Sequence, residues 1–280
     1  MSSQRSTLSG LEYEVHGEGN PVIALHGSAS TAAQWKSLTG YLEGRFRIYT
    51  PDLPGYGGSA PAPTPGLAGD ARAIGALIDR ISAPVHLVGH SYGGALALKL
   101  AASRPDAVRS LTVIGPVAFH LLRRGTEADR RLYDDVMWLG AAMDPESDEG
   151  ARIAAMGRFI DYWNGPGAWA RSSPALRDFL LKCHDRVRAD LAAIAGEEAS
   201  MAELACIDRP TLAIMGLDSP TSSLRVTEIV ARAIPRAVLR MIPDAGHMVP
   251  LTDPHLVDPL IGDHLVAAGR APRPTPAMAA

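Results

Sequence analysis

The sequence predicts an α/β protein, with a mostly parallel central sheet flanked by helices and a helical lid inserted between two core strands. Three observations predict this architecture. Short apolar runs alternate with helical patterns in residues 1–115. The alternation stops in residues 116–208, which are helical in character throughout, and it resumes in residues 209–269. Because strands that alternate with helices are typical of parallel sheets, we expect one domain interrupted by a lid.

The first part of the core is predicted to begin with a hairpin. Leu11–His16 alternates as a strand does, turn residues occupy 17–20, and an apolar run follows at residues 22–25. Pro84 separates a helical pattern from the strand after it. The elements expected next are a helix over residues 33–42, a strand over 47–50, a helix over 67–81, a strand over 85–88, a helix over 93–103 and a strand over 111–114.

The second part of the core is predicted after the lid. Its expected elements are a strand over residues 211–215, a helix over 224–234, a strand over 238–242 and a last helix over 255–268. The Pro-rich segment 270–280 has nothing apolar enough to pack, so we expect a disordered tail.

Composition narrows the classes of function. The chain has 280 residues, a net charge of −3 and no basic cluster, which argues against nucleic acid as a partner. No segment resembles a signal peptide or reaches the length of a membrane span, so we expect a cytoplasmic protein without membrane contact. Cys183 and Cys206 lie far apart without a metal-binding pattern, and we expect neither a disulfide framework nor a zinc site.

The strongest local signal is Gly89-His90-Ser91-Tyr92-Gly93, a Gly-x-Ser-x-Gly pattern between an apolar strand and a helix. In that context the serine occupies a sharp turn that lifts its hydroxyl above the sheet, and the glycines let strand and helix approach. The alternative is an ordinary Gly-rich turn with an N-capping serine. We expect Ser91 to be a nucleophile and its neighbour His90 to be packed and hydrogen-bonded.

A serine nucleophile needs a base, and the loop Pro243-Asp244-Ala245-Gly246-His247 supplies one after the last apolar strand. Of the nine histidines, only His247 combines a late position, a preceding glycine and a loop after a strand. His247 is therefore the predicted base.

Taken in order along the chain, several motifs resemble those of the α/β-hydrolase superfamily, particularly the lidded members that hydrolyse small esters. They are His26-Gly27-Ser28, Asp52-Leu53-Pro54-Gly55-Tyr56-Gly57-Gly58-Ser59, the Gly89–Gly93 pattern and Gly246-His247. The resemblance spans nearly the whole chain, and it implies that the backbone amides of Ser28 and Tyr92 form an oxyanion hole. A serine at position 91 disfavours the relatives that attack with aspartate.

The third member of a triad is harder to assign. The order Ser, acid, His requires a carboxylate after the strand at residues 211–215, and Asp218 is the candidate. Most relatives carry the acid one position later, where this chain has Ser219, and others carry it after the strand that ends at Ile114, where it has Gly115. The competing interpretations are a turn-forming Asp218 beside a weaker Ser-His pair, or an acid from elsewhere such as Asp244. Asp52 is expected to brace its own loop.

The lid is expected to carry the substrate pocket. Phe119, Trp138 and Trp163 are the residues predicted to lie near it, although aromatic side chains in such a region also pack helices together.

The predicted function is a serine hydrolase that cleaves a small or medium ester, thioester or lactone through an acyl-enzyme intermediate, with no metal and no organic cofactor. Its expected partner is a small, partly hydrophobic substrate. Carbon–carbon bond hydrolysis, acyl transfer or perhydrolysis on the same triad is an alternative, and so is a non-catalytic small-molecule receptor built on this fold.

Overall fold

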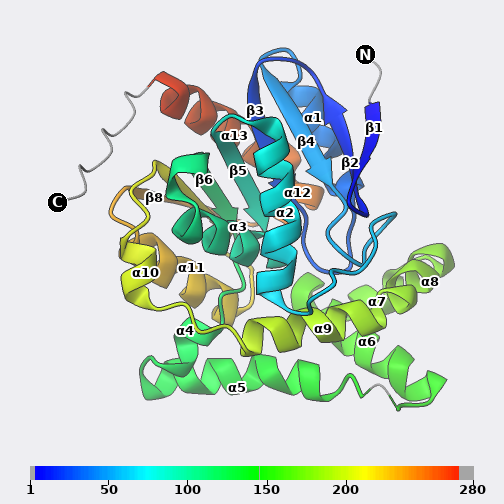
Figure 1. The fold of residues 1–280 in the computed structure, drawn as a ribbon. Coiled ribbons are helices and arrows are strands. Elements are labelled where there is room, and N and C mark those ends of the chain that lie inside the picture. The colour runs from blue at the N-terminus through cyan, green and yellow to red at the C-terminus, as the bar shows by residue number, and fades with distance from the viewer. Residues whose placement is uncertain (1–3, 145, 271–280) are drawn as a thin grey trace.

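The structure, a computed structural model, describes residues 4–144 and 146–270, and its centre is one eight-stranded sheet (Figure 1). The strand order is β1-β2-β4-β3-β5-β6-β7-β8. The strands are β1 (Gln4–Leu8), β2 (Leu11–His16), β3 (Asn20–Leu25), β4 (Phe46–Pro51), β5 (Val85–His90), β6 (Val108–Ile114), β7 (Thr211–Gly216) and β8 (Ala237–Ile242).

The sheet is parallel from β4 through β8 in the spatial order, and only β1 and β2 run antiparallel to their neighbours. The predicted hairpin between residues 11–16 and 22–25 is wrong. β2 pairs with β1 and with β4, while β3 lies between β4 and β5 and is parallel to both. An uninterrupted apolar run such as Val22-Ile23-Ala24-Leu25 is typical of a strand covered on both faces, which places it inside a parallel sheet.

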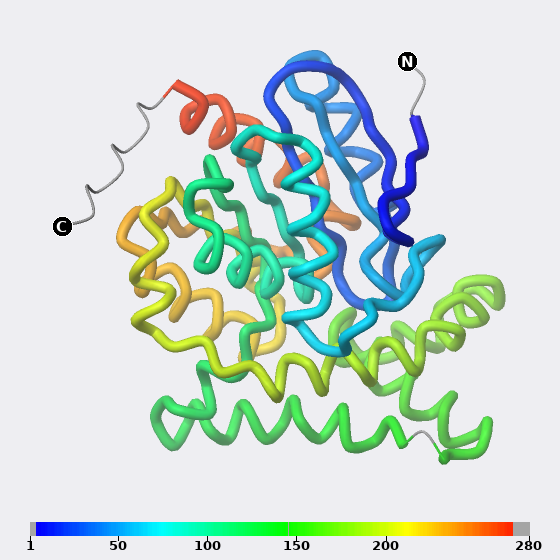
Figure 2. Tube along the Cα trace, in the orientation of Figure 1, coloured from blue at the N-terminus to red at the C-terminus, as the bar shows by residue number. Residues whose placement is uncertain are grey.

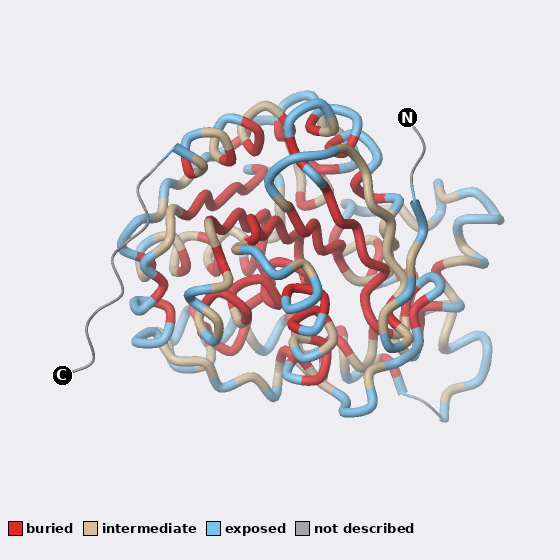
Figure 3. The backbone as a smooth tube through the Cα atoms, turned by 45° about the horizontal axis from the view of Figure 1, so that its top comes forward, coloured by how far each residue is buried: buried red, intermediate tan, exposed pale blue. Residues whose placement is uncertain are grey.

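Helices cover both faces of the sheet, as the alternation predicts. On one face, α1 (Lys36–Leu42) and α13 (Pro254–Arg270) pack against the strands, and on the other lie α2 (Leu67–Ile81), α3 (Tyr92–Ser103) and α11 (Thr221–Ala233). Figure 3 shows the central strands buried between these layers, whereas the edge strands β1 and β8 are partly exposed. The short elements η1 (Ala32–Trp35), η2 (Pro105–Ala107) and α12 (Val249–Thr252) lie in the connections.

All regular elements between β6 and β7 are helices. Most helices of this insertion lie along the lower edge of Figures 1 and 2, and its last helix packs against α11 and α3 of the core. Its helices are α4 (His120–Arg123), α5 (Glu127–Ala141), α6 (Glu149–Asn164), α7 (Ala168–Arg171), α8 (Pro174–Lys182), α9 (His184–Ala195) and α10 (Met201–Ala205). β6 and β7 are adjacent parallel strands, so the chain leaves the sheet and returns beside the strand that it left.

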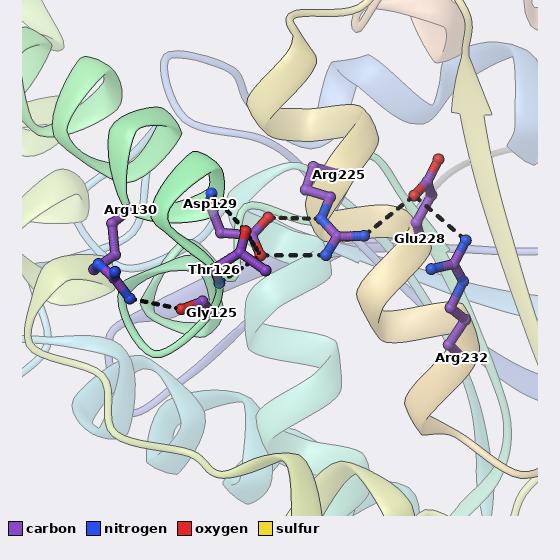
Figure 4. A network of polar contacts seen from close by, with 7 residues as sticks. All are labelled: Gly125, Thr126, Asp129, Arg130, Arg225, Glu228 and Arg232. Carbon is purple, nitrogen blue, oxygen red and sulfur yellow. Dashed lines mark hydrogen bonds and ion pairs between the residues drawn. The ribbon is translucent and has the colours of Figure 1, made fainter.

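An ion pair fastens the insertion to the core. Arg225 of α11 donates from Nε to Oδ1 of Asp129 in α5 at 2.6 Å, and Asp129 also accepts from the backbone of Thr126 at the start of its own helix (Figure 4). None of the helices within residues 4–144 and 146–270 is both long and apolar enough to cross a membrane. Of the predicted tail, Arg270 ends α13, and the remaining residues lie outside the described part of the chain.

Candidate functional site

The predicted site residues follow the carboxyl ends of the parallel strands. Ser28 follows β3, Ser91 follows β5, Gly115 follows β6, Asp218 follows β7 and His247 follows β8. In open α/β sheets these ends meet along one edge, where ligands bind. The topology therefore brings together segments that are up to about 220 residues apart in the sequence.

Ser91 occupies a strained turn between β5 and α3. Its backbone has φ 54° and ψ −118°, a conformation that a residue with a side chain rarely adopts. A Cβ at position 89 would lie 2.3 Å from the carbonyl oxygen of Gly93, and one at position 93 would lie 2.3 Å from that of Leu25. Glycine at both positions is what lets the turn close.

The His26-Gly27-Ser28 segment lies directly beside Ser91. A Cβ at position 27 would be 3.1 Å from the Ser91 Cβ. Leu53 N donates to Nε2 of His26 at 2.9 Å, so Nδ1 carries the proton and donates to the Gly27 carbonyl at 2.7 Å. The Gly27 amide donates to Oε1 of Gln34 at 3.1 Å. Hydrogen bonds thus hold this segment against the turn that carries Ser91.

Of the two predicted oxyanion residues, Ser28 borders the cavity and the buried Tyr92 directly follows Ser91. Ser28 lines the cavity that also exposes Ser91. Tyr92 is the first residue of α3, and the first amides of a helix have no acceptor within it, so the Tyr92 amide is available to a ligand.

His247 lies beside the Ser91 turn and lines the same cavity. Its ring centroid is 5.0 Å from that of His90, and its Nδ1 atom is 3.2 Å from Oγ of Ser223. Within the described residues its Nε2 atom has no hydrogen-bond partner. Burial, followed by the neighbouring His90, holds the pKa of His247 well below its ordinary value. The imidazole is therefore neutral at pH 7, and its Nε2 is buried without a partner among the described residues.

Asp218 does not form the expected hydrogen bond with His247 in the part of the chain that the structure describes. Its side chain is exposed, and its backbone amide donates to the Ala245 carbonyl at 2.9 Å, which ties the loop after β7 to the loop after β8. Ser223, near the start of α11, occupies the place at Nδ1 that a carboxylate takes in a triad. The hydrogen bond to Ala245 fixes the backbone at position 218 while the side chain is exposed to solvent, and no hydrogen bond joins its carboxylate to His247 among the described residues.

The alternative position for a triad acid, directly after the strand that ends at Ile114, is occupied by Gly115, and the structure leaves no room there for a side chain. A Cβ there would lie 2.9 Å from Nδ1 of His247 and 3.3 Å from Oγ of Ser223. The glycine leaves the room that the imidazole and the Ser223 hydroxyl occupy, and any side chain at position 115 would displace one of them.

The other acids and histidines considered from the sequence have structural surroundings. His90 is buried, and its Nε2–H donates to the His247 carbonyl at 2.9 Å, which confirms the expected packed, hydrogen-bonded histidine. Burial lowers its pKa to about 4. Asp52 accepts from the amides of Ala32 and Gly58, as expected of a residue that braces its loop. Asp244 is exposed in a turn with φ 52°.

A cavity of about 600 Å³ opens between the core and the insertion at Ser91. Its wall is mostly apolar, and aromatic or aliphatic side chains from the insertion form much of it, among them Phe119, Phe159, Trp163, Phe179, Leu191 and Ile194. Trp163 is buried, and its ring centroid lies 4.2 Å from that of His247. Phe119 also stacks on Trp163, with 6.1 Å between the ring centroids.

Trp138 does not line this cavity, in contrast to the expectation from the sequence. Its side chain is 59% exposed on α5, and its ring lies 5.6 Å from the guanidinium carbon of Arg158. Trp138 lies on an exposed face of α5, whereas Trp163 lies on a buried face of α6. Aromatic composition alone does not reveal which face of a helix a residue occupies.

Residues that the sequence did not single out also meet here. Ser223 contacts His247, and the buried Asp190 of α9 accepts from the Ser28 hydroxyl at 2.6 Å. The spacing of Arg186 and Asp190, four residues apart, is a signal for a pair on one helix face but not for a contact with a loop about 160 residues away. Among the described residues, no group of three or more His, Cys, Asp or Glu side chains could hold a metal ion.

Comparisons with known proteins point in one direction. The model of the Alpha/beta hydrolase family matches residues 22–259. A (E)-2-((N-methylformamido)methylene)succinate hydrolase from Acinetobacter baylyi is 26% identical over 273 residues, which cover 91% of this chain and 94% of that protein. A pimeloyl-(acyl-carrier protein) methyl ester esterase from Nitrosomonas europaea is 26% identical, with coverage of 86% and 93%.

The fold of this chain is also similar to that of solved structures. A thermophilic esterase from Thermogutta terrifontis superposes with a TM-score of 0.72 at 23% identity, covering 96% of this chain and 99% of that one.

Proposed function

This chain belongs to the alpha/beta hydrolase family, and from that premise we propose that it is a serine hydrolase that cleaves a small or medium ester, thioester or lactone. The relatives named above are hydrolases, and one of them is by name a methyl ester esterase. The observation that carries the proposal is Ser91, held in a strained turn at the cavity wall beside a neutral His247 whose Nε2 is free.

The proposed reaction proceeds through an acyl-enzyme. The Ser91 hydroxyl oxygen attacks the carbonyl carbon of the substrate, and its proton passes to Nε2 of His247. The negative charge that develops on the carbonyl oxygen is bound by the amides of Ser28 and Tyr92. The leaving group departs with the proton from His247. Water then attacks the acyl-enzyme with His247 again as base, which releases the acid and restores Ser91.

The base in this proposal works without a carboxylate. Ser223 orients the imidazole through Nδ1, and the face of Trp163 supports the positive charge that His247 carries while it holds the proton. A hydroxyl stabilises an imidazolium less than a carboxylate does. We therefore infer a Ser91–His247 pair that is slower than a complete triad.

The cavity supports a partly hydrophobic acyl group as the substrate. Its apolar walls come from the insertion, which acts in this proposal as the lid of the site. Arg171 also lines the cavity, is exposed and forms no ion pair with any residue that the structure describes. A cation in that position favours an acyl chain whose far end is polar or anionic.

Other reactions on the same residues, namely carbon–carbon bond hydrolysis, acyl transfer and perhydrolysis, are the second candidate class, because the same nucleophile and base serve them. A non-catalytic receptor is a third. Release of p-nitrophenol together with the free acid from simple esters distinguishes hydrolysis from a non-catalytic receptor and from obligate acyl transfer.

An active-site phosphonate probe tests the proposal. We expect one phosphonyl group per chain on the wild-type protein, located at Ser91, and none on Ser91→Ala. Turnover of p-nitrophenyl esters of increasing chain length then reports the acyl preference. A folded wild-type protein that is not labelled, or a Ser91→Ala variant that is labelled equally, would contradict the serine hydrolase.

A further inference from the structure

Two buried carboxylates and a half-buried arginine connect the insertion to both predicted oxyanion residues. Arg186 and Asp190 lie one turn apart on α9, and Asp70 lies in the first turn of the core helix α2. The Arg186 guanidinium forms ion pairs with both carboxylates, with 2.8 Å between Nη2 and Oδ1 of Asp190. Asp70 and Asp190 have no measurable exposure. We call Asp70, Arg186 and Asp190 the buried charge cluster.

Each carboxylate of the buried charge cluster holds one oxyanion residue. Oδ2 of Asp190 accepts from the Ser28 hydroxyl at 2.6 Å, and Oδ2 of Asp70 accepts from the Tyr92 hydroxyl at 2.6 Å. We propose that this cluster positions Ser28 and Tyr92, so that α9 of the insertion sets the geometry of the oxyanion hole. The inference rests on the proposed function, because it concerns how that function's oxyanion hole is held.

Charge balance explains why Ser28 is bound so firmly. One guanidinium serves two buried carboxylates, so Asp190 needs further hydrogen-bond donors to remain ionised in the interior. It has two, the hydroxyls of Ser28 and Tyr56, both at 2.6 Å from the same oxygen. Burial raises the pKa of Asp190 to about 6, while Arg186 and these two donors lower it. The Ser28 hydroxyl is therefore required by the buried charge and cannot rotate freely.

Ser28 depends on this contact more than Tyr92 does. The Tyr92 amide belongs to α3, which fixes its direction by itself. Ser28 lies in the loop between β3 and η1, next to Ala29 with φ 55°. Since an amide in a loop can turn away from the oxyanion, the hydroxyl contact with Asp190 adds a restraint at Ser28 itself to the hydrogen bonds that hold His26 and Gly27.

The same helix also forms part of the cavity wall. Leu191 and Ile194 of α9 line the cavity directly after Asp190 in the sequence. An acyl chain that packs against them therefore contacts the helix that holds Ser28. In this arrangement Arg186 and Asp190 are positioning residues, since they act through Ser28 and do not line the cavity themselves.

The test uses Asp190→Asn, Ser28→Ala and the double variant in the full-length protein. An asparagine at 190 keeps the size of the side chain, but it either presents its NH₂ group to Arg186 or turns it toward the hydroxyls of Ser28 and Tyr56. We expect kcat for a p-nitrophenyl ester to fall about 10- to 100-fold with KM changed little, since loss of an oxyanion donor costs about 100- to 1000-fold and misalignment costs less. In the Ser28→Ala background, Asp190→Asn should lower kcat by less than about twofold, because its route to the site is already lost.

Asp129→Asn is the matched control, since Asp129, like Asp190, is a buried carboxylate of the insertion that accepts hydrogen bonds from the core, but its core partner is Arg225 and it forms no hydrogen bond to Ser28, Ser91 or His247 (Figure 4). Its kcat should stay within about twofold of wild type, in line with independent sites. A kcat loss equal to that of Asp190→Asn would overturn the proposal, as would a loss for Asp190→Asn that is undiminished in the Ser28→Ala background.

Folding and labelling keep the outcomes separate. If Asp190→Asn does not fold, Ser28→Ala alone decides, and a wild-type kcat for that variant overturns the proposal. Phosphonate labelling of the wild type at Ser91 reports the proposed function independently. A labelled wild type with an unaffected Asp190→Asn variant refutes only the buried charge cluster, whereas an unlabelled wild type refutes the hydrolase itself.

Discussion

The Nδ1 atom of His247 lies 3.2 Å from the hydroxyl oxygen of Ser223, in the place where a triad has its acid. Among the described residues the exposed Asp218 forms no hydrogen bond with this ring, and Gly115 has no side chain to offer. A neutral partner orients the imidazole but adds no negative charge when His247 takes a proton. Turnover in this site should therefore depend on the proton affinity of an unusually weak base.

Substitution of Ser223 should reveal that dependence. Ser223→Ala removes one neutral hydrogen bond, worth about 1 kcal/mol, so we expect kcat to fall about fivefold. Ser223→Asp supplies a carboxylate near the start of α11 and should move the acidic limb of the pH–kcat profile to higher pH, because an anion raises the pKa of a nearby histidine. Ser222→Ala is the control and should leave the profile where it is. An acidic limb unmoved by Ser223→Asp would mean that Ser223 does not serve His247.

Asp218→Asn should retain turnover within about threefold of wild type, since loss of a true triad acid costs about 10⁴ in kcat. The reason is its exposure and the absence of a hydrogen bond to His247 among the described residues. The measurement is steady-state hydrolysis of a p-nitrophenyl ester. A loss of several orders of magnitude would show that Asp218 turns inward during the reaction.

Trp163→Leu should lower kcat about 3- to 30-fold, because a desolvated cation–aromatic contact is worth about 0.5–2 kcal/mol. The effect follows from the position of the indole, 4.2 Å from the His247 ring between centroids. Trp138→Leu is the matched comparison: its side chain is exposed on α5, and its kinetics should equal those of wild type. Equal losses in both variants would assign the effect to the stability of the insertion.

Arg171 should discriminate between acyl chains by their far ends. We expect Arg171→Gln to raise KM about 5- to 10-fold for p-nitrophenyl monoesters of dicarboxylic acids, as befits the loss of a charge-assisted contact of about 1 kcal/mol. The KM for a neutral ester of the same length should not change. A parallel rise for both substrates would indicate that Arg171 shapes the cavity without recognising charge.

The folded protein should lose stability as the pH falls from about 6.5 to 4, the window set by the ordinary and the shifted histidine pKa values. Burial lowers the pKa of His26, His90 and His120 to about 4 and that of His86 to about 3. In this window the four imidazoles become protonated in the unfolded chain but stay neutral in the folded protein, so protonation favours unfolding. Each contributes a slope of up to about 1.4 kcal/mol per pH unit.

Asp190 acts in the opposite direction, because burial raises its pKa to about 6 and the folded state binds its proton first. Urea denaturation midpoints at pH 7, 6 and 5 measure the balance. His120→Phe removes one of the four groups and should flatten the decline. Midpoints that rise on acidification would show that the carboxylates outweigh the histidines.

Much of the fold could be predicted because its signals are local. The pattern over residues 67–81 is a helix with the same ends in the structure, and the strand at Leu11–His16 also has the predicted bounds. The pairing of that strand was not predictable, since a strand with one alternating face fits beside any neighbour of suitable register. The strand Leu11–His16 pairs with β4 because the chain crosses over to place β3 between β4 and β5, which leaves the other edge of β4 open to it.

The sequence alone determined the position of Ser91 in its turn, because the strand, the two glycines and the helix that define it are contiguous. Which side chains surround Ser91 was determined only by the tertiary structure. Ser223, Trp163 and Asp190 reach the site from separate elements, and their directions depend on helix faces and loop paths that no short motif encodes. The same reason places Asp218 and Trp138 outside the site: a side chain's direction is set by packing across the sheet and the insertion, where the interacting residues lie far apart in the chain.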